Sequence, residues 1–342
     1  MVKRNAVWKR EIPCLVCETP MVNYQFMTKS QTIVYDDWMV AHMHPVGDYG
    51  AYPEELKTTV CPACLTASNE YNYGVDQRAY FSRNTRKNNQ IKGMFEQCCD
   101  DRFGLLAREF DRFEKESALL DTQHNRPANT RAKATFEKIW THREEYGIPF
   151  FTLMFEPPRD FVTTLVCFAL DRYCQMAQIC YHLDIEASSW EYEALSDAIE
   201  EKLTNQPLSM KSGEPRFYFV ATNYLQSLQF LIKMKQNLYP EQEGPHDELI
   251  DHYWREAYRF SKLSYANDDL SAVPCEVKEG GAHLLMARLH FRFEMDDDGI
   301  RCLRQAKKYA DNRLRHISSL NQQKFVNDVE DLTKKYLTKN NG

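Results

Sequence analysis

Hydrophobic positions change their spacing along the chain at about residue 100. Before this point, β-prone runs at residues 24–27 and 32–35 show partial alternation and are separated by turn-forming Asp, Pro and Gly residues. Beyond it, apolar residues recur every three or four positions with charged residues between them, which is typical of amphipathic helices. The pattern predicts a small β domain over residues 1–75, a linker over residues 76–99 and an α-helical domain over residues 100–342.

The helical region predicts a series of long helices joined by short breaks. An apolar run predicts one helix over residues 217–238, and a second helix has its inner face between Leu249 and Phe260. A long loop is expected over residues 264–281, ending at Gly280 and Gly281. Three further helices are predicted at about residues 282–295, 299–315 and 321–337.

Helices of this length joined by short breaks are typical of arrays of helix hairpins. Ala287, Ala306 and Ala310 are small residues at places where tetratricopeptide hairpins need close helix approach. No clear period of about 34 residues recurs along the chain. The expected fold class is mainly α: a small N-terminal β ribbon followed by an α-helical tetratricopeptide-like bundle or array, with an irregular helical bundle as the alternative.

Four cysteines near the N-terminus form two Cys-x-x-Cys pairs, Cys14 with Cys17 and Cys61 with Cys64. Each pair can form a tight turn, or knuckle, that directs both sulfurs to one point. Two knuckles supply the four thiolates of a closed structural zinc site. We therefore predict that these four cysteines bind one structural Zn²⁺.

Other interpretations of these cysteines remain open. A redox-active pair is disfavoured because no βαβ pattern surrounds either motif, while isolated disulfides and inert thiols are further alternatives. His42 and His44 lie between the pairs and could replace a sulfur ligand. Four cysteines already fill a tetrahedral shell, which favours two polar surface histidines instead. The other seven of the eleven cysteines are expected to be small buried apolar residues.

Composition and charge restrict the classes of function. The 342 residues suffice for two or three domains, and only 12 glycines favour helices over sandwiches or barrels. The net charge of −6 disfavours a nucleic-acid partner. The opening residues contain no apolar signal-peptide core, and no run of about eighteen apolar residues is present. We therefore expect a cytoplasmic protein without a membrane span.

The N-terminal motifs resemble a bacterial family known as domain of unknown function 2225. The matching residues are Cys14-Leu15-Val16-Cys17, Ser30, Tyr52-Pro53 and Val60-Cys61-Pro62-Ala63-Cys64. The resemblance covers about the first seventy residues, and this chain has Leu65 where a glycine usually follows the second knuckle. It implies a cysteine ribbon followed by tetratricopeptide-like helices. The family has no established activity, so the resemblance implies a metal-bearing scaffold and no reaction.

The sequence contains no Gly-rich phosphate loop, Gly-x-Ser-x-Gly elbow or His-Glu-x-x-His motif. We therefore expect a non-catalytic, zinc-stabilised cytoplasmic scaffold or adaptor that binds a protein partner through its helical array. One alternative is a nucleic-acid-binding zinc-ribbon protein that uses the basic N-terminal arm and residues 78–92. Another is an enzyme with a site around His283 and His290, where Arg288 and Arg292 could form an anion pocket. Ordinary helix-surface residues are the simpler interpretation of these two histidines.

Overall fold

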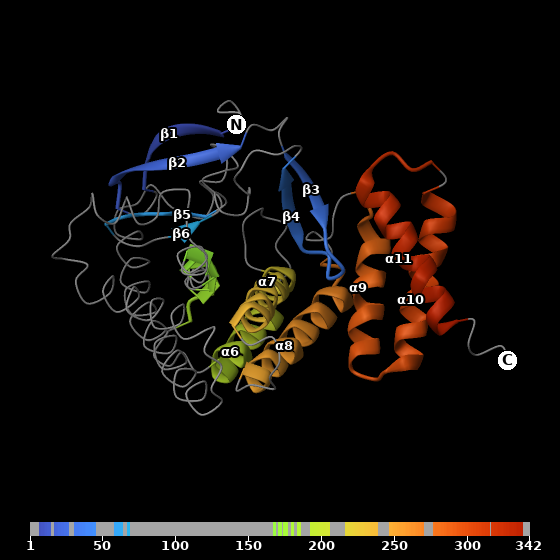
Figure 1. Cartoon of the computed structure of the whole chain (residues 1–342). Helices are drawn as coiled ribbons and strands as arrows, with labels where there is room; N and C mark the ends of the chain where they lie inside the picture. The colour runs from blue at the N-terminus through green and yellow to red at the C-terminus, as the bar shows by residue number, and fades with distance from the viewer. Residues whose placement is uncertain are drawn as a thin grey trace, which may run out of the picture. The chain divides into compact units, whose positions relative to one another are not determined.

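The structure is a computed structural model of the chain (Figure 1). It describes residues 7–14, 17–26, 31–45, 58–63, 67–68, 167–168, 170–172, 174–176, 179–180, 183–185, 192–205, 216–238, 246–269, 276–314 and 316–337. These residues are mostly helical, with short paired strands toward the N-terminus. The expectation of a mainly α protein with a small N-terminal β region is confirmed in this coarse form.

The chain divides into two compact units. The first contains Met1–Gln31, Pro45–Glu214 and Ile232–Gln242, and the second contains Thr32–His44, Pro215–Leu231 and Glu243–Gly342. Thr32–His44, which the sequence assigns to the β domain, thus belongs to the same unit as the C-terminal helices. The predicted boundaries at residues 75 and 99 stay a prediction, because residues 69–166 lie outside the described residues.

Two short hairpins form the β part of the first unit. Strand β1 (Val7–Pro13) pairs antiparallel with β2 (Pro20–Phe26), and β5 (Thr59–Val60) pairs antiparallel with β6 (Ala67–Ser68). The Asn23 side chain donates a hydrogen bond of 2.7 Å to the Thr59 hydroxyl. Both side chains are buried, so this bond fixes β2 relative to β5 from the inside.

A helical segment packs against the second hairpin. The described residues between 167 and 180 are helical, and the segment ends where Asp184 takes a left-handed conformation with φ of 54°. The backbone N–H of Ile185 then donates to the Cys180 carbonyl at 2.9 Å, as in a Schellman cap. The backbone N–H of Ala67 donates to the sulfur of the fully buried Cys174 at 3.3 Å. Helix α6 (Tyr192–Asn205) follows, with Ile199 and Leu203 buried.

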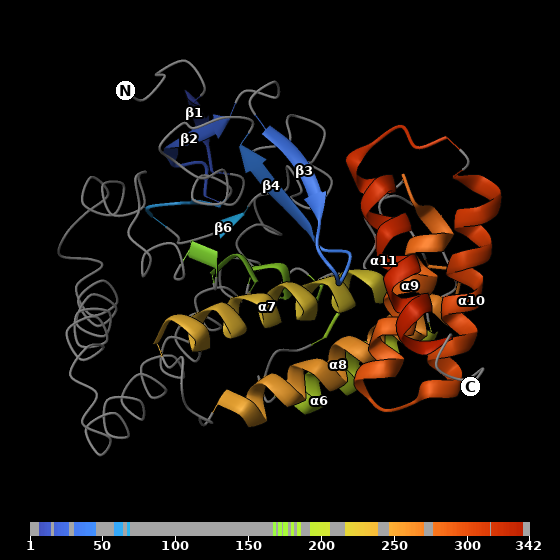
Figure 2. The same cartoon turned by 45° about the vertical axis from the view of Figure 1, so that its right-hand side comes forward.

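Long helices make up most of the second unit. Their bounds are α7 (Phe217–Leu238, which continues into the first unit), α8 (His246–Ala266), α9 (Lys278–Arg292), α10 (Asp296–Arg313) and α11 (Leu320–Tyr336). Helices α9, α10 and α11 lie side by side in both views (Figures 1 and 2). Within the described part of the chain, no helix combines the length and the apolar character that crossing a membrane requires.

Helices α9 and α10 form an antiparallel hairpin through a tight turn at residues 293–295. Glu294 takes a left-handed conformation with φ of 57°, and the N–H of Met295 donates to the His290 carbonyl at 2.9 Å. Helix α8 ends in the same way, with Asp268 left-handed and the N–H of Asp269 donating to the Ser264 carbonyl. These caps pair the orphan carbonyls and stop each helix without glycine.

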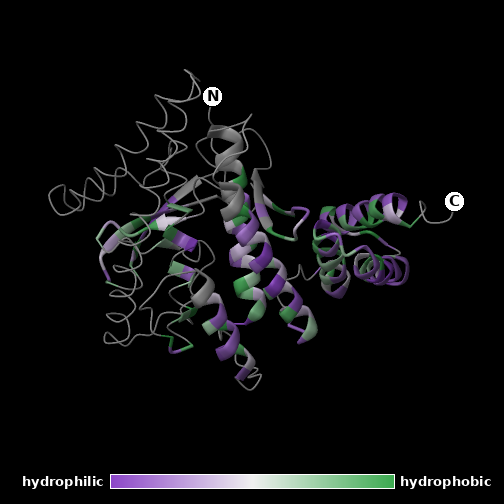
Figure 3. Ribbon diagram, turned by 90° about the horizontal axis from the view of Figure 1, so that it is seen from below, coloured by the Kyte–Doolittle hydropathy of each residue, from purple (hydrophilic) through white to green (hydrophobic). Residues whose placement is uncertain are grey.

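One hydrophobic core cluster of this unit lies between α9, α10 and α11. Hydrophobic and hydrophilic bands alternate along these helices (Figure 3), because their apolar residues recur at helical spacing. The buried cluster consists of Val277, Leu284, Ala287, Leu303, Ala306, Ala310, Leu314, Phe325 and Val329. The three alanines that the sequence places at close helix contacts are all in this cluster, which lets the backbones approach.

Two glycines bring aromatic rings against the backbone at the two ends of the α9–α10 hairpin. A Cβ at Gly280 would lie 2.3 Å from the Tyr309 ring, and one at Gly299 would lie 2.5 Å from the Phe291 ring. The Phe291 ring in turn stacks on Tyr336 with 3.7 Å between ring centroids. Both glycines therefore serve packing, where a side chain would collide.

The predicted helices from residue 217 onward agree with the structure to within a few residues, and the largest difference is at the start of α9. Helix α7 has the predicted bounds, and α9, α10 and α11 begin and end within a few residues of their predictions. The predicted loop over residues 264–281 is too long, because α8 continues to Ala266 and α9 begins at Lys278. Gly280 and Gly281, expected at the end of the loop, lie in the first turn of α9, where Gly280 makes room for the Tyr309 ring.

We expect the Gly299→Ala substitution to destabilise the protein, although alanine favours helix more than glycine does. The new methyl group would overlap a Phe291 ring that is held against Tyr336, and overpacking of this kind costs about 1–3 kcal/mol. Urea unfolding followed by circular dichroism measures the change. Lys308→Ala, at an exposed position of the same helix, is the control and should stay within about 0.5 kcal/mol of the wild type. An unchanged or raised stability of Gly299→Ala would contradict the packing role.

Candidate functional site

The first Cys-x-x-Cys motif lies in the connection between β1 and β2. Pro13 and Pro20 are the last paired residues of the two strands, so residues 14–19 form the connection. The Cys14 N–H donates to the Thr19 carbonyl at 2.9 Å, and the Glu18 N–H donates to the Cys14 carbonyl at 3.0 Å. These bonds close the connection into a compact turn that holds Cys14 and Cys17 on the same side.

Glu18 has a left-handed backbone conformation with φ of 61°. Glutamate is strained there by about 1–2 kcal/mol, because its Cβ approaches the following carbonyl group. The conformation lets the chain turn back toward β2 directly after Cys17. The Cys17 thiol donates to the Thr19 hydroxyl at 3.2 Å, and a hydroxyl can also donate to a thiolate. The Thr19 side chain is therefore a partner for Cys17 in either protonation state.

The second motif begins in an equivalent connection. Val60 and Ala67 are the last paired residues of β5 and β6, so residues 61–66 connect these strands. Both connections contain six residues, and cysteines occupy the first and fourth positions of each. Cys61 is completely buried at the first position, which corresponds to Cys14. Cys64 stands at the fourth position in the sequence, which corresponds to Cys17, and lies outside the described residues.

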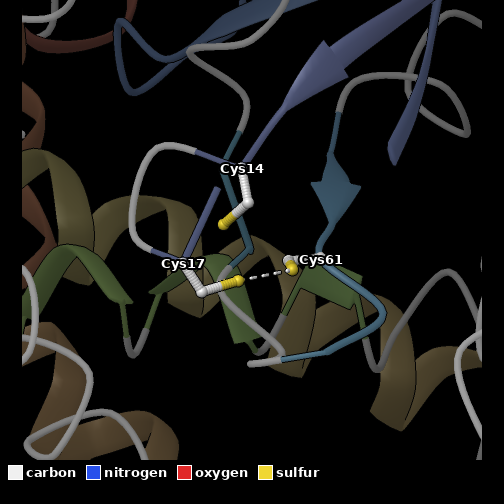
Figure 4. A group of neighbouring side chains, drawn as sticks. All are labelled: Cys14, Cys17 and Cys61. Carbon is white, nitrogen blue, oxygen red and sulfur yellow. Dashed lines mark hydrogen bonds between the residues drawn. The ribbon is translucent and has the colours of Figure 1, made fainter. Parts of the chain in front are cut away.

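Cys14, Cys17 and Cys61 direct their sulfurs to one place (Figure 4). The three sulfurs all lie within 4.8 Å of one another, and those of Cys17 and Cys61 are 3.5 Å apart. None of the three forms a disulfide. The structure thus brings three of the four cysteines of the two motifs together, and this cluster could hold a metal ion. The assignment of all four as ligands stays a prediction.

The chemistry of the cluster fits a thiophilic metal. Sulfurs bound to one tetrahedral Zn²⁺ at about 2.3 Å are about 3.8 Å apart, close to the spacing seen here. Cys14 and Cys61 are 1% and 0% exposed, so a bound ion would be shielded from water. Three thiolates crowded in a buried place would repel each other strongly without a cation. The arrangement therefore suits a structural ion better than a reactive thiol.

His42, which lies between the two motifs, has a partner in the second unit. His42 donates from Nε2 to the Asp36 carboxylate at 3.2 Å, which occupies it within the second unit. His44 lies in strand β4, and its side chain lies outside the described residues. The expectation that cysteines rather than histidines supply the ligands stays a prediction.

The other described cysteines belong to the protein interior. Cys167, Cys174 and Cys180 are each 1% exposed or less, as expected of small apolar residues. Cys302 of α10 is half-buried, and burial raises the pKa of its thiol. A raised pKa leaves this thiol protonated and unreactive at neutral pH.

His283 and His290 form two separate pairs with tyrosines of α8. His283 Nδ1 lies 2.6 Å from the Tyr265 hydroxyl, and His290 Nδ1 lies 3.2 Å from the Tyr258 hydroxyl. Burial lowers the pKa of both histidines, so both are neutral at pH 7. The simpler interpretation of His290 as a surface residue is wrong, because only 7% of it is exposed. Each pair instead holds α9 against α8.

Sequence reasoning missed a cluster of contacts on strands β3 (Gln31–Tyr35) and β4 (Ala41–Pro45). These strands pair, and five residues connect them, so they form an antiparallel hairpin. We call Asp36–Val40 the tip of this hairpin. The Asp36 carboxylate accepts the N–H groups of Trp38 and Val40 at 2.8 and 2.9 Å, which fixes the turn. The Gln229 side chain of α7 also donates to Asp36.

The tip carries an acidic residue that pairs with α9 and α11. Lys324 donates to the Asp37 carboxylate at 2.7 Å, and Arg288 lies 3.7 Å from it and also donates to the Asp37 carbonyl. Asp328 completes the network, 3.1 Å from Arg288 and 2.8 Å from Lys324. The anion that the sequence anticipates near Arg288 is thus a carboxylate of the same chain. In the sequence, Asp36 and Asp37 signal only a turn, because their partners are far along the chain.

The basic segment at residues 78–92 lies outside the described residues, so the nucleic-acid alternative stays a prediction. Comparisons with protein-family models, with curated proteins and with solved structures find no match to this chain. The resemblance to domain of unknown function 2225 therefore also stays a prediction.

We expect Glu18→Gly to stabilise the first unit by about 0.5–1 kcal/mol. Glycine removes the strain of the left-handed conformation, and the larger entropy of glycine in the unfolded chain offsets part of the gain. Urea unfolding in the presence of zinc measures the change. Glu11→Gly, at an exposed position of β1 without this conformation, should destabilise instead. Equal effects of the two substitutions would rule out a strained knuckle.

We expect the stability of the wild type to fall as the pH decreases below about 6.5, partly through His290. Burial first, and then the charges of Lys262 and Arg301, lower the pKa of His290 in the folded state. The unfolded chain therefore binds a proton at this imidazole more readily than the folded chain does. Neutral His290 contributes fully to the free energy of unfolding above about pH 6.5, and this contribution is lost as the pH falls through the lowered pKa. The free energy of unfolding of His290→Gln should thus depend less on pH between 7.5 and 5. Gln305→Ala, at an exposed position of α10, is the control and should retain the wild-type pH dependence. A pH profile of His290→Gln identical to that of the wild type would contradict this prediction.

Proposed function

We propose that this protein is a zinc-stabilised, non-catalytic scaffold or adaptor, which binds a protein partner through its helices. The observation that carries the proposal is the convergence of three cysteine sulfurs from two separate knuckles. A closed cysteine site supplies stability to a small β region and leaves no ligand position for a substrate.

Zinc with four cysteine ligands is the proposed state of this cluster. Cys64 has the same place in the second connection as Cys17 in the first, which supports it as the fourth ligand. Four thiolates suit zinc, whose preferred geometry is tetrahedral. Reduced cysteines persist in a reducing compartment, so the cytoplasm is part of the proposal.

The helical part supports the role in binding. In the hairpin of α9 and α10, the buried Ala287, Ala306 and Ala310 allow close packing, and α11 continues the stack. Stacked helix hairpins of the tetratricopeptide kind are extended platforms for other proteins. We propose a tetratricopeptide-like array on this basis, together with the cysteine-ribbon family that the N-terminal motifs resemble.

The metal content tests the proposal directly. The purified chain should contain about one zinc ion, and Cys17→Ser, Cys61→Ser and Cys64→Ser should each lose it, because a structural site needs all its ligands. Mass spectrometry of the native protein and atomic absorption measure the metal. Cys302→Ser alters a cysteine of α10 and should keep the zinc. Substoichiometric zinc in the wild type, or full zinc in Cys64→Ser, would contradict the proposed centre.

The role in binding needs a separate measurement. Affinity purification of the native protein, followed by reciprocal purification through each recovered protein, should yield a partner that binds the purified chain directly. The absence of any direct protein partner would count against the scaffold function even if zinc is present.

A further inference from the structure

The tip of the β3–β4 hairpin is held on a defined surface of the helices. We call this surface the docking face; it consists of Trp254 of α8, Arg288 and Arg292 of α9, and Asn321, Lys324 and Asp328 of α11. All of its residues, and all of the tip, belong to the second unit. The way in which the tip occupies this face resembles the way in which helical arrays bind short peptides.

The docking face recognises both the charge and the backbone of the hairpin. Arg288 and Lys324 hold the Asp37 carboxylate, and Asp328 fixes both cations from the other side. The Asn321 side chain donates to the Ile33 carbonyl at 3.1 Å and accepts the Tyr35 N–H at 3.3 Å. Such contacts to alternate residues are those by which a receptor pairs with an extended peptide strand.

Aromatic and apolar contacts add to this recognition. Trp38 meets Trp254 edge-on with 4.6 Å between ring centroids, and the Arg292 guanidinium lies 4.2 Å from the Trp254 ring centroid. Met39 packs against the buried cluster of α9, α10 and α11. Acid, tryptophan and methionine thus each have a separate partner, and tryptophan is among the residues that contribute most to the binding energy of interfaces.

The contacts between the tip and the docking face stabilise the bound tip only modestly. Met39 reaches the core only by taking a left-handed conformation with φ of 59°, which strains a residue other than glycine. The Asp37 side chain is 66% exposed, so water screens its ion pairs. The hydrogen bond from Lys324 and the charge of Arg288 lower the pKa of Asp37 and keep it ionised at neutral pH. A segment held in this way can be displaced by another of the same chemistry.

We propose that the docking face is a peptide-binding site for segments of a partner protein in which an acidic residue directly precedes a tryptophan. The tip, Asp36–Val40, occupies the site when no partner is bound and competes with the partner. The inference rests on the proposed scaffold function, since it names the surface and the chemistry of the partner.

Competition by the tip can be measured with a synthetic peptide of residues 31–45 carrying a fluorophore. The full chain with Asp37→Ala and Trp38→Ala, which we call the tip variant, should bind this peptide about tenfold more tightly than the wild type. In the wild type the tethered tip is present at high effective concentration, and in the tip variant its anchors are gone. Fluorescence anisotropy measures binding, and circular dichroism verifies the fold. If the double substitution unfolds the chain, Asp37→Ala alone replaces the tip variant. It should also bind the peptide more tightly than the wild type does.

The docking face is tested in the background of the tip variant. Arg288→Ala with Lys324→Ala should weaken peptide binding about tenfold or more, as should Asp37→Asn within the peptide. Lys307→Ala, which removes an exposed lysine paired with Asp311 of α10, is the matched control and should leave binding unchanged. Equal binding to the wild type and the tip variant, or no effect of the docking-face substitutions, overturns the inference.

Two further results separate the possible occupants. If the wild type forms a concentration-dependent dimer and the peptide dissociates it, the occupant of the site is a second copy of this chain. This result would overturn the assignment to a partner protein. If a partner binds the purified wild type and the docking-face variant equally well, the scaffold function is supported. The proposal that the docking face is the binding site is then overturned. The absence of any partner, with the peptide still bound as expected, removes the scaffold function and leaves the site.

Discussion

The hairpin of β5 and β6 depends on contacts beyond its own pairing, because its strands are too short to hold together alone. Strands β5 and β6 have two residues each, and an isolated hairpin of that size is not stable in water. Three contacts compensate: the bond between Asn23 and Thr59, the bond from Ala67 to Cys174, and the meeting of the cysteine sulfurs. A metal at the sulfurs would supply the largest of these contributions, since its bonds form only in the folded chain.

The second unit depends instead on the distances between the axes of α8, α9 and α10. Gly280 and Gly299 let rings of Tyr309 and Phe291 lie directly on the neighbouring backbone, so α9 and α10 approach closely at both ends. On the opposite side, the two tyrosine–histidine pairs hold α9 at the distance of a hydrogen bond from α8. Helix α9 is thus fixed from two sides, by apolar contact on one and by polar pairs on the other. This fixed helix presents Arg288 to the hairpin tip.

The sequence predicted what depends on local pattern. The bounds of α7 follow from its apolar run, and the meeting of Cys14 and Cys17 with Cys61 follows from a spacing that has few other uses. The start of α9 was misplaced, because Gly280 serves a ring of another helix and not a turn. The contact of Asp37 with Arg288 joins residues 251 positions apart, and neither residue carries a local sign of its partner. The left-handed Met39 was equally hidden, since glycine or asparagine is the usual residue there.

The hairpin lies, along the chain, inside the segment that the cysteine cluster closes. Cys17 and Cys61 are 44 positions apart, and Thr32–His44 falls between them. Closing such a ring removes conformational freedom from every residue in it, and seating the hairpin on its helices removes part of the same freedom. A metal bound at the cluster would therefore lower the entropic cost of seating the hairpin, and metal affinity and the seating of the hairpin would be thermodynamically linked. Loss of such an ion would in turn weaken the contacts of the hairpin with Arg288 and Lys324.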